Sequence, residues 1–157
     1  GLNYLAEYNL AKPYTYSSRT SILSYSHYSE PLAHPYGGNF KEAVAILSYN
    51  WKRFDISSKL NVANYGLDPG KIINYGKDVF KPYINHVRDD GNYTGQGINT
   101  DFLYFENRLA FLLNPKTNLR LELGAVYRNE KNVSGDNTTK WFTFGLRSSF
   151  RNLYQDF

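Results

Sequence analysis

The sequence predicts an all-β fold, namely a segment of a transmembrane β-barrel built from six antiparallel strands. Three observations support this prediction. Apolar and polar residues alternate with a period of two over long stretches, no helical period lasts for two turns, and long connections alternate with very short ones. No apolar run exceeds about five residues, whereas a membrane-spanning helix requires roughly 20. The strands of a barrel do not need a continuous apolar run, because their residues face lipid and the lumen alternately.

The first half of the chain supplies three of the six predicted strands. The first covers residues 2–11, where nearly every second residue is apolar. Residues 12–39 are rich in Tyr, Ser, Pro, Gly and His, which predicts a long, structured loop. The second and third strands, residues 40–51 and 54–64, are separated only by Lys52-Arg53, so they should form a tight hairpin.

The second half of the chain contains the clearest alternation. Residues 66–100 form a second long loop, punctuated by Gly, before a hairpin of strands at 102–113 and 118–128. Residues 129–139 are polar and predict a third loop, which leads to the last strand at 140–150. One parity of these three strands is apolar and is expected to face lipid. Its candidate lipid-facing residues are Leu109, Phe111, Leu121, Leu123, Phe144 and Leu146.

The lengths of the strands and connections favour the bacterial outer membrane. The predicted strands have about 10 to 12 residues, which matches the ~9–11 residues of a tilted bilayer crossing. Every long connection falls at one end of the sheet, as in barrels with long extracellular loops and short periplasmic turns. Aromatic residues at the two ends suggest interfacial girdles, although Tyr and Trp also favour strands in general. The girdle candidates are Tyr49, Trp51 and Phe54 at the turn end, and Tyr8, Tyr65, Tyr127 and Trp141 near the loop end.

Six strands are too few to close a barrel, because the smallest bacterial barrels have eight. We therefore expect residues 1–157 to be the C-terminal part of a larger barrel, with both ends of the segment on the periplasmic side. The chain contains no Met, which favours this interpretation. The final Phe157 also agrees with the aromatic residue that commonly ends such barrels.

The polar parity predicts a row of charges across the lumen wall. If the second hairpin closes around Pro115, Arg108 faces Glu122, and Arg147 of the last strand lies on the other side of Glu122. Such a row would neutralise its own charge. The alternative is that the three side chains are hydrated separately, because a one-residue change of register removes the row.

The composition argues against several classes of function. The net charge of +4 comes from mixed signs without a basic run, so nucleic acid is not an expected partner. The absence of Cys excludes disulfides and Cys-ligated metal. No Gly-rich phosphate loop or nucleophile elbow is present, so we expect a noncatalytic protein without cofactor or metal. His27, His34 and His86 lack zinc-site spacing. Asp89, Asp90, Asn92 and Thr94 have oxygen atoms suited to Ca²⁺, but an Asp-Gly turn is the simpler interpretation.

The first long loop carries the candidate ligand-binding residues. Aromatic faces with hydroxyl or imidazole groups can stack on sugar rings and form hydrogen bonds with them. The candidates are Tyr14, Tyr16, Tyr25, Tyr28, His34 and Tyr36. The alternative is that these side chains pack the loop on itself and roof the barrel, since Pro13, Pro31 and Pro35 imply a rigid loop.

Four blocks of the sequence carry a family resemblance. They are EYNLAKPYTYSS (7–18), YSHYSEPLAHPYGGNFKE (25–42), ENRLAFLLNPKTNLRLELGAVYR (106–128) and WFTFGLRSSFRNLYQDF (141–157). Together they resemble the C-terminal barrel region of the Wzi-like capsule-assembly outer-membrane proteins, and within these the RemB-like gliding-motility branch of the Bacteroidetes. The resemblance implies an outer-membrane protein that contacts lipid and engages surface polysaccharide or motility and secretion machinery. It implies no catalytic residues.

Two other functions are compatible with the same pattern. One is an accessory barrel of a larger outer-membrane complex for secretion, motility or uptake, whose loops dock protein partners. The other is a soluble β-sandwich module that binds carbohydrate, which requires that the protein be water-soluble without detergent.

Overall fold

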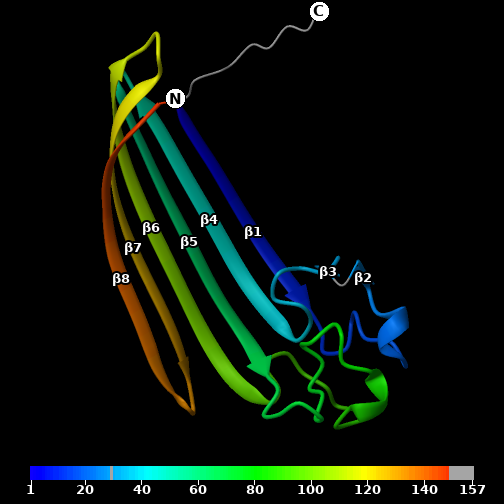
Figure 1. The fold of residues 1–157 in the computed structure, drawn as a ribbon. Coiled ribbons are helices and arrows are strands. Elements are labelled where there is room, and N and C mark those ends of the chain that lie inside the picture. Colours follow the sequence, from blue (N-terminus) through cyan, green and yellow to red (C-terminus); the bar gives the residue numbers. More distant parts are fainter. Residues whose placement is uncertain (29, 149–157) are drawn as a thin grey trace, which may run out of the picture.

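The computed structural model describes residues 1–28 and 30–148 and consists mainly of one six-stranded antiparallel sheet. The strand order is β1-β4-β5-β6-β7-β8, so the six long strands lie side by side in the order in which they occur in the chain (Figure 1). The strands are β1 (Leu2–Ala11), β4 (Phe40–Trp51), β5 (Phe54–Leu67), β6 (Ile98–Asn114), β7 (Leu119–Asn132) and β8 (Gly135–Arg147). β1 and β8 are the edges, and in the described residues the sheet is open.

The predicted all-β, six-stranded antiparallel architecture is confirmed, and the bounds of β1 and β4 are the predicted ones. The third and fourth strands are longer than predicted, because β5 continues to Leu67 and β6 begins at Ile98. The predicted end of the last strand, at residues 149–150, lies outside the described residues, as does Phe157.

The predicted third loop at 129–139 is wrong. β7 and β8 stay paired through this region as far as Asn132 and Gly135, so only a two-residue turn separates them. Both parities of the strands are polar here. Hydrophobic alternation is therefore absent from this region, although the backbone of the two strands continues to pair.

The remaining connections lie as the sequence predicts. The two long loops, residues 12–39 and 68–97, are at one end of the sheet, and the hairpin turns at 52–53 and 115–118 are at the other (Figure 1). The loops contain two short 3-10 turns, η1 (Ser21–Leu23) and η2 (Tyr83–Asn85), and a small ribbon of β2 (Ser26–His27) and β3 (Glu30–Pro31). Lys52 has a φ of 55°, the left-handed conformation that such a tight turn requires.

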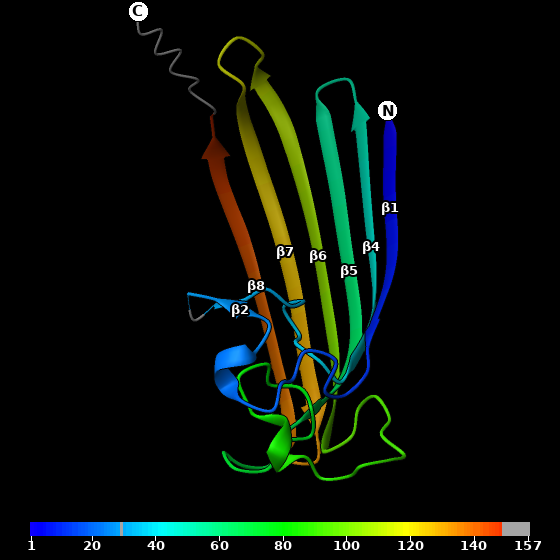
Figure 2. The same cartoon turned by 90° about the vertical axis from the view of Figure 1, so that its right-hand side faces the viewer.

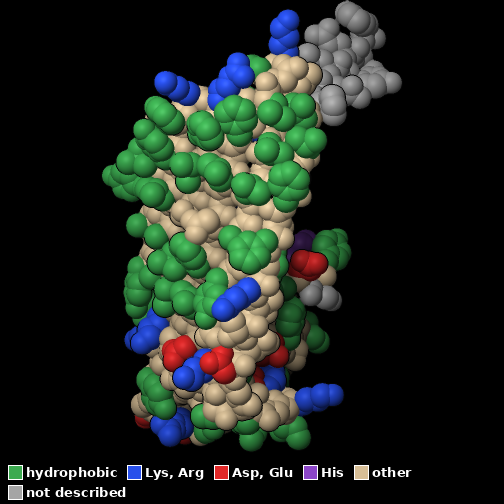
Figure 3. Space-filling view, turned by 90° about the vertical axis from the view of Figure 1, so that its left-hand side faces the viewer, with side chains coloured by type: hydrophobic (Ala, Val, Ile, Leu, Met, Phe, Trp, Pro, Cys, Tyr) green, Lys and Arg blue, Asp and Glu red, His purple; other side chains and the backbone are tan. Residues whose placement is uncertain are grey.

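The sheet is bowed, and both long loops lie on its concave side (Figures 1 and 2). The small core is found there. Phe40, Ala11, Ala63 and Tyr65 are buried on the concave face, where Tyr36 of the first loop packs against them. The convex face carries most of the other large apolar side chains, which cover much of it (Figure 3).

In the described part of the chain, no helix has the length and apolar character needed to cross a membrane.

Candidate functional site

Residues 12–39 and 68–97 fold together into one unit, which we call the loop cap. Backbone hydrogen bonds join the two loops directly: Tyr14 N donates to Gly76 O at 3.1 Å, and Gly38 N donates to Lys77 O at 3.0 Å. A third bond runs from Tyr83 N to Ser18 O at 2.7 Å. The loop cap lies in front of the loop end of the sheet when the concave side is viewed (Figure 2).

Asn39 fastens the loop cap to the sheet. Its side chain is fully buried, and its amide donates to Gly66 O at 3.3 Å and to Gln96 O at 2.8 Å. Its Oδ1 accepts a hydrogen bond from Gly95 N at 2.7 Å. The φ of Asn39 is 57°, a conformation that Asn adopts more readily than most residues. One side chain thus joins the first loop, the end of β5 and the second loop.

Tyr14, a candidate ligand-binding residue, is part of this internal framework. Its hydroxyl donates to Asn74 O at 2.7 Å and accepts from Val87 N at 3.2 Å. Its ring packs edge-on against Tyr83, with ring centroids 5.3 Å apart. Burial raises the pKa of the Tyr14 hydroxyl. The side chain joins the two loops and does not present a free face to a ligand.

His34 and Tyr36 of the loop cap pack against the sheet. His34 Nε2 lies 2.9 Å from Glu42 Oε1, and its ring stacks on Phe40 at a centroid distance of 4.4 Å. Tyr36 stacks on Tyr65 at 5.3 Å. Burial and then the nearby Glu42 carboxylate raise the pKa of Tyr36 to about 12. Both candidates therefore belong to the core beneath the loop cap.

Tyr16, Tyr25 and Tyr28 lie elsewhere in the first loop. Tyr16 and Tyr25 stack on each other with centroids 5.7 Å apart, and Tyr25 is 53% exposed. Tyr28 is 89% exposed beside His27. The six candidate residues thus fall into separate clusters, and only Tyr25 and Tyr28 among them are largely exposed.

A cavity of about 510 Å³ lies between the two loops, and sequence reasoning missed the lysines that line it. Lys77 Nζ donates to Tyr36 O at 2.7 Å and lies 4.3 Å from the centroid of the Tyr65 ring, and burial lowers its pKa. Lys81 Nζ lies 2.7 Å from the Asp68 carboxylate and also donates to two backbone carbonyls. The ammonium groups of Lys77 and Lys81 thus have partners within the loop cap and stabilise it, whereas the third lysine of the lining, Lys71, is exposed.

The described residues contain no group of three His, Cys, Asp or Glu side chains placed to hold a metal. His86 stacks on Tyr83 at a centroid distance of 4.3 Å, and its Nε2 lies 2.7 Å from Asp89 Oδ1. The hydrogen bond to Asp89, followed by that to the Tyr83 carbonyl, raises the pKa of His86.

The predicted charge row on the concave face is only partly present. The prediction that Arg108 faces Glu122 is wrong, because Arg108 lies opposite Gly124 and bonds Glu106 at 2.8 Å. The turn occupies residues 115–118, so the β6–β7 hairpin is centred one residue beyond Pro115 and each β6 residue pairs two positions further along β7 than predicted. Arg147 Nη1 does lie near Glu122, at 3.7 Å from Oε1.

The concave face instead carries short clusters of Tyr, Glu and Arg that sequence reasoning did not identify. Glu106 accepts hydrogen bonds from Tyr104 at 2.8 Å and from Arg108. Glu130 likewise accepts from Tyr65 at 2.9 Å and from Arg128 at 2.6 Å. The Glu and Arg of each cluster are two residues apart, which places both side chains on the same face of a strand. This spacing could have identified the clusters from the sequence.

The candidate lipid-facing residues share the convex face. Leu109 lies between Ile56 and Leu123 in the register, and Phe111 lies between Phe54 and Leu121. On the edge strand β8, Phe144 is 73% exposed and Leu146 is 66% exposed. Of the predicted girdle residues, Tyr65 and Trp141 are exceptions, because their parity places them on the concave face.

The apolar area of the convex face ends along a slanted line. One row of paired residues, which we call the boundary row, crosses the sheet near its loop end: Leu10, Lys41, Asn64, Asp101, Lys131 and Asp136. On β1 the apolar residues reach this row at Leu10. On β8 the last one is Phe142, six residues from Asp136. The limit thus shifts by six residues across the sheet.

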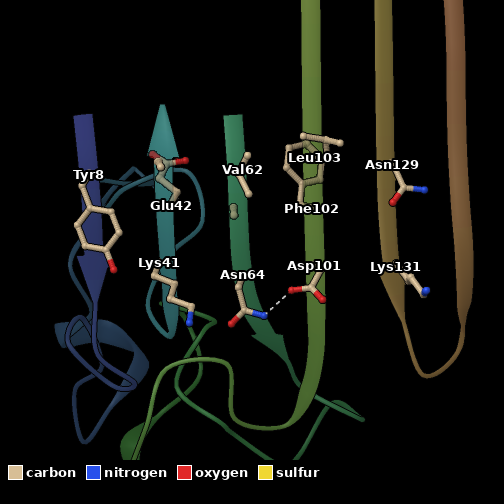
Figure 4. A pocket seen from close by; sticks show the side chains of 12 residues that line it. Tyr8, Lys41, Glu42, Val62, Asn64, Asp101, Phe102, Leu103, Asn129 and Lys131 are labelled. Atoms are coloured by element: carbon tan, nitrogen blue, oxygen red, sulfur yellow. Dashed lines mark hydrogen bonds between the residues drawn. The ribbon is translucent and has the colours of Figure 1, made fainter. Parts of the chain in front are cut away.

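A shallow hollow of about 430 Å³ lies where the apolar area meets the boundary row (Figure 4). Its apolar part is formed by the small residues Ala43 and Val62, between the longer side chains of Tyr8 and Leu103. Its polar part consists of Asn129 and residues of the boundary row. Sequence reasoning missed this hollow, because it depends on which residues become neighbours across five strands.

Comparisons of the chain with protein family models, curated proteins and solved structures found no significant match. The resemblance to the Wzi-like family therefore remains a prediction from the sequence.

Proposed function

We propose that this chain forms part of the wall of a bacterial outer-membrane β-barrel, with the convex face against lipid and the concave face toward the lumen. The observation that carries this proposal is the slanted limit of the apolar area. Strands in barrels tilt by about 40°, lie ~4.8 Å apart and rise ~3.4 Å per residue. The residue that lies at the membrane surface should therefore shift along the strand by roughly 1.2 residues from each strand to the next. Over five steps this gives about six residues, in agreement with the shift from Leu10 to Phe142.

Closure of such a barrel requires more strands. The edges β1 and β8 present backbone groups with no partner in the described residues over ten and thirteen residues, respectively. An unpaired backbone group in lipid costs several kcal/mol, so these edges must be paired within a bilayer. We expect the additional strands to come from a longer form of this chain or from another chain.

We propose further that the protein is a noncatalytic surface protein acting in capsule or exopolysaccharide attachment or in gliding motility. The resemblance to the Wzi-like family supports this function. The extracellular side would be the loop cap, where Tyr25 and Tyr28 have exposed rings that can stack on sugars. The role of Tyr14, His34 and Tyr36 would be to hold the loop cap rigid.

A second candidate function, an accessory barrel that docks protein, is favoured by exposed aliphatic side chains on the loop cap. Ile22 is 94% exposed, Ile72 77% and Ile84 75%. Aliphatic side chains offer no hydrogen bonds to a sugar, whereas a protein partner can bury exposed apolar surface. The β-sandwich alternative has no comparable support, because in residues 1–28 and 30–148 the only other sheet is the two-residue ribbon of β2 and β3.

Purification from native membranes in mild detergent would separate the two candidates. Polysaccharide attachment predicts a preparation that retains surface polysaccharide and loses it when Tyr25 and Tyr28 are replaced by Ala. Protein docking predicts a stoichiometric protein partner, which Ile22→Ser and Ile84→Ser should release. A preparation that retains neither ligand would contradict both candidates, and recovery of the protein in the soluble fraction would contradict the barrel itself.

A further inference from the structure

The hollow on the convex face combines an apolar floor with two unused hydrogen-bond donors. Its floor, Ala43 and Val62, continues the apolar area of β4 and β5. The donors are the Tyr8 hydroxyl and the Lys41 ammonium group, which Figure 4 shows directed toward the loop end of the sheet. Within the described residues neither side chain has a hydrogen bond or ion pair, and Tyr8 is 66% exposed.

The other polar side chains of the hollow are engaged or have opposing charges beside them. Asn64 donates to Asn99 Oδ1 at 2.6 Å and to Asp101 Oδ1 at 2.8 Å, so both hydrogens of its amide are used. Lys131 is paired in the register with Asp101 on one side and Asp136 on the other. Lys41 has Leu10 and Asn64 as its register neighbours, so the positive end of the hollow is at β1 and β4.

We propose that this hollow binds a phosphate-bearing lipid. Its acyl chain would lie over Ala43 and Val62, and its phosphate oxygens would accept hydrogen bonds from Lys41 Nζ and the Tyr8 hydroxyl. The proposal rests on the membrane placement proposed above, in which the β1 and β4 end of the boundary row lies at the level of the lipid headgroups. The positions agree with the chemistry, since the donors begin where the apolar residues of β4 end.

The test measures lipid retention by the full-length protein, purified from native membranes in mild detergent. Phosphatidylglycerol and digalactosyldiacylglycerol with the same acyl chains are titrated separately, and bound lipid is counted by native mass spectrometry. We expect one phosphatidylglycerol to bind more tightly than the phosphate-free lipid. Lys41→Gln should weaken it about fivefold, the contribution of one lysine near a charged lipid surface. Tyr8→Phe should also weaken it, and Asp101→Asn should strengthen it by removing a nearby negative charge.

Matched controls separate the site from general effects. Tyr4→Phe changes the same strand and face deeper in the apolar area, and Lys71→Gln changes an exposed loop lysine; both should leave retention unchanged. Ala43→Phe should fill the floor and weaken both lipids. Equal retention of the two lipids, or no effect of Lys41→Gln with normal folding by circular dichroism, would overturn the proposal.

A second measurement distinguishes failure of the lipid site from failure of the proposed membrane placement. Vesicles of digalactosyldiacylglycerol alone contain no phosphate, so flotation of the protein with them reports membrane association independently of this site. If the protein floats but does not prefer phosphatidylglycerol in detergent, only the lipid site is refuted. If it does not float, the proposed placement in the membrane is refuted as well.

Discussion

Asn39 makes the contacts on which the loop cap most directly depends. Asn39→Gly keeps a residue that tolerates the positive φ but removes three hydrogen bonds of a fully buried side chain. Unpaired buried partners cost about 1–3 kcal/mol, so local opening of the loop cap should become easier by that amount. Amide hydrogen exchange of residues 68–97 measures this, with the exposed Asn85→Ala as the control. Unchanged protection in Asn39→Gly would show that the loops are held by other contacts.

His86 makes one contact in the second loop dependent on pH. Both ring nitrogens face oxygen acceptors, the Tyr83 carbonyl at 2.8 Å and Asp89 at 2.7 Å, so the protonated ring satisfies both. Its pKa is raised in the folded state. The stabilisation is therefore complete below the unfolded pKa of about 6.5 and is lost as the pH rises through the folded pKa.

An NMR titration of the His86 ring protons should give a midpoint above about 6.5, which Asp89→Asn should lower. Protection of the loop amides near η2 should fall over the same pH range in the wild type and remain flat in His86→Gln. A midpoint that Asp89→Asn does not change would contradict the assigned cause.

For single residues, the sequence shows which loop side chains are aromatic but does not predict which of them are exposed. Tyr14 contacts Asn74, sixty residues away, and Tyr36 stacks on Tyr65 of the wall. Such pairs depend on how the loops fold against each other and against the sheet, and no periodicity in either loop predicts that. The sequence allowed two interpretations of these residues, sugar binding or packing of the loop. For Tyr14, His34 and Tyr36 the contacts favour packing.

At the element scale, parity is the most robust prediction. The β6–β7 pairing differs by two residues from the expected register, which changes the partner of Arg108 but keeps every side chain on its predicted face. The limits of β7 and β8 were harder to predict, because at their loop end both faces of the strands carry polar residues. Hydrophobic alternation marks the part of a strand with one apolar face, and the backbone pairs beyond it.

A pair of substitutions on adjacent strands tests which face of the sheet contacts lipid. Leu109 lies near the middle of the convex apolar stretch of β6, so Leu109→Arg should cost about 2–4 kcal/mol of stability in lipid. Arg120→Leu on the concave face breaks a partly exposed ion pair with Asp55 at 3.1 Å, which is worth about 1 kcal/mol or less. Urea unfolding in lipid vesicles compares them. A larger loss for Arg120→Leu would mean that the faces are assigned the wrong way round.

For the whole molecule, the two faces of one sheet have different roles. The convex face is apolar over most of its height and carries charged side chains only toward its ends (Figure 3). The concave face holds paired charges and the loop cap (Figure 2). The sequence predicts this division through parity. It does not predict the slant of the apolar limit, because the slant appears only when six strands are placed in register.

The most direct test of the lipid-facing convex surface is a spin-label scan of β7. The chain has no Cys, so single cysteines at Leu121, Glu122, Leu123 and Val126 can each be labelled alone in vesicles. Collision rates with oxygen, which concentrates in lipid, and with a water-soluble nickel chelate are then compared. We expect labels at Leu121 and Leu123 to favour oxygen and those at Glu122 and Val126 to favour nickel. Equal accessibility at all four positions, or the opposite alternation, would contradict a lipid-facing convex surface.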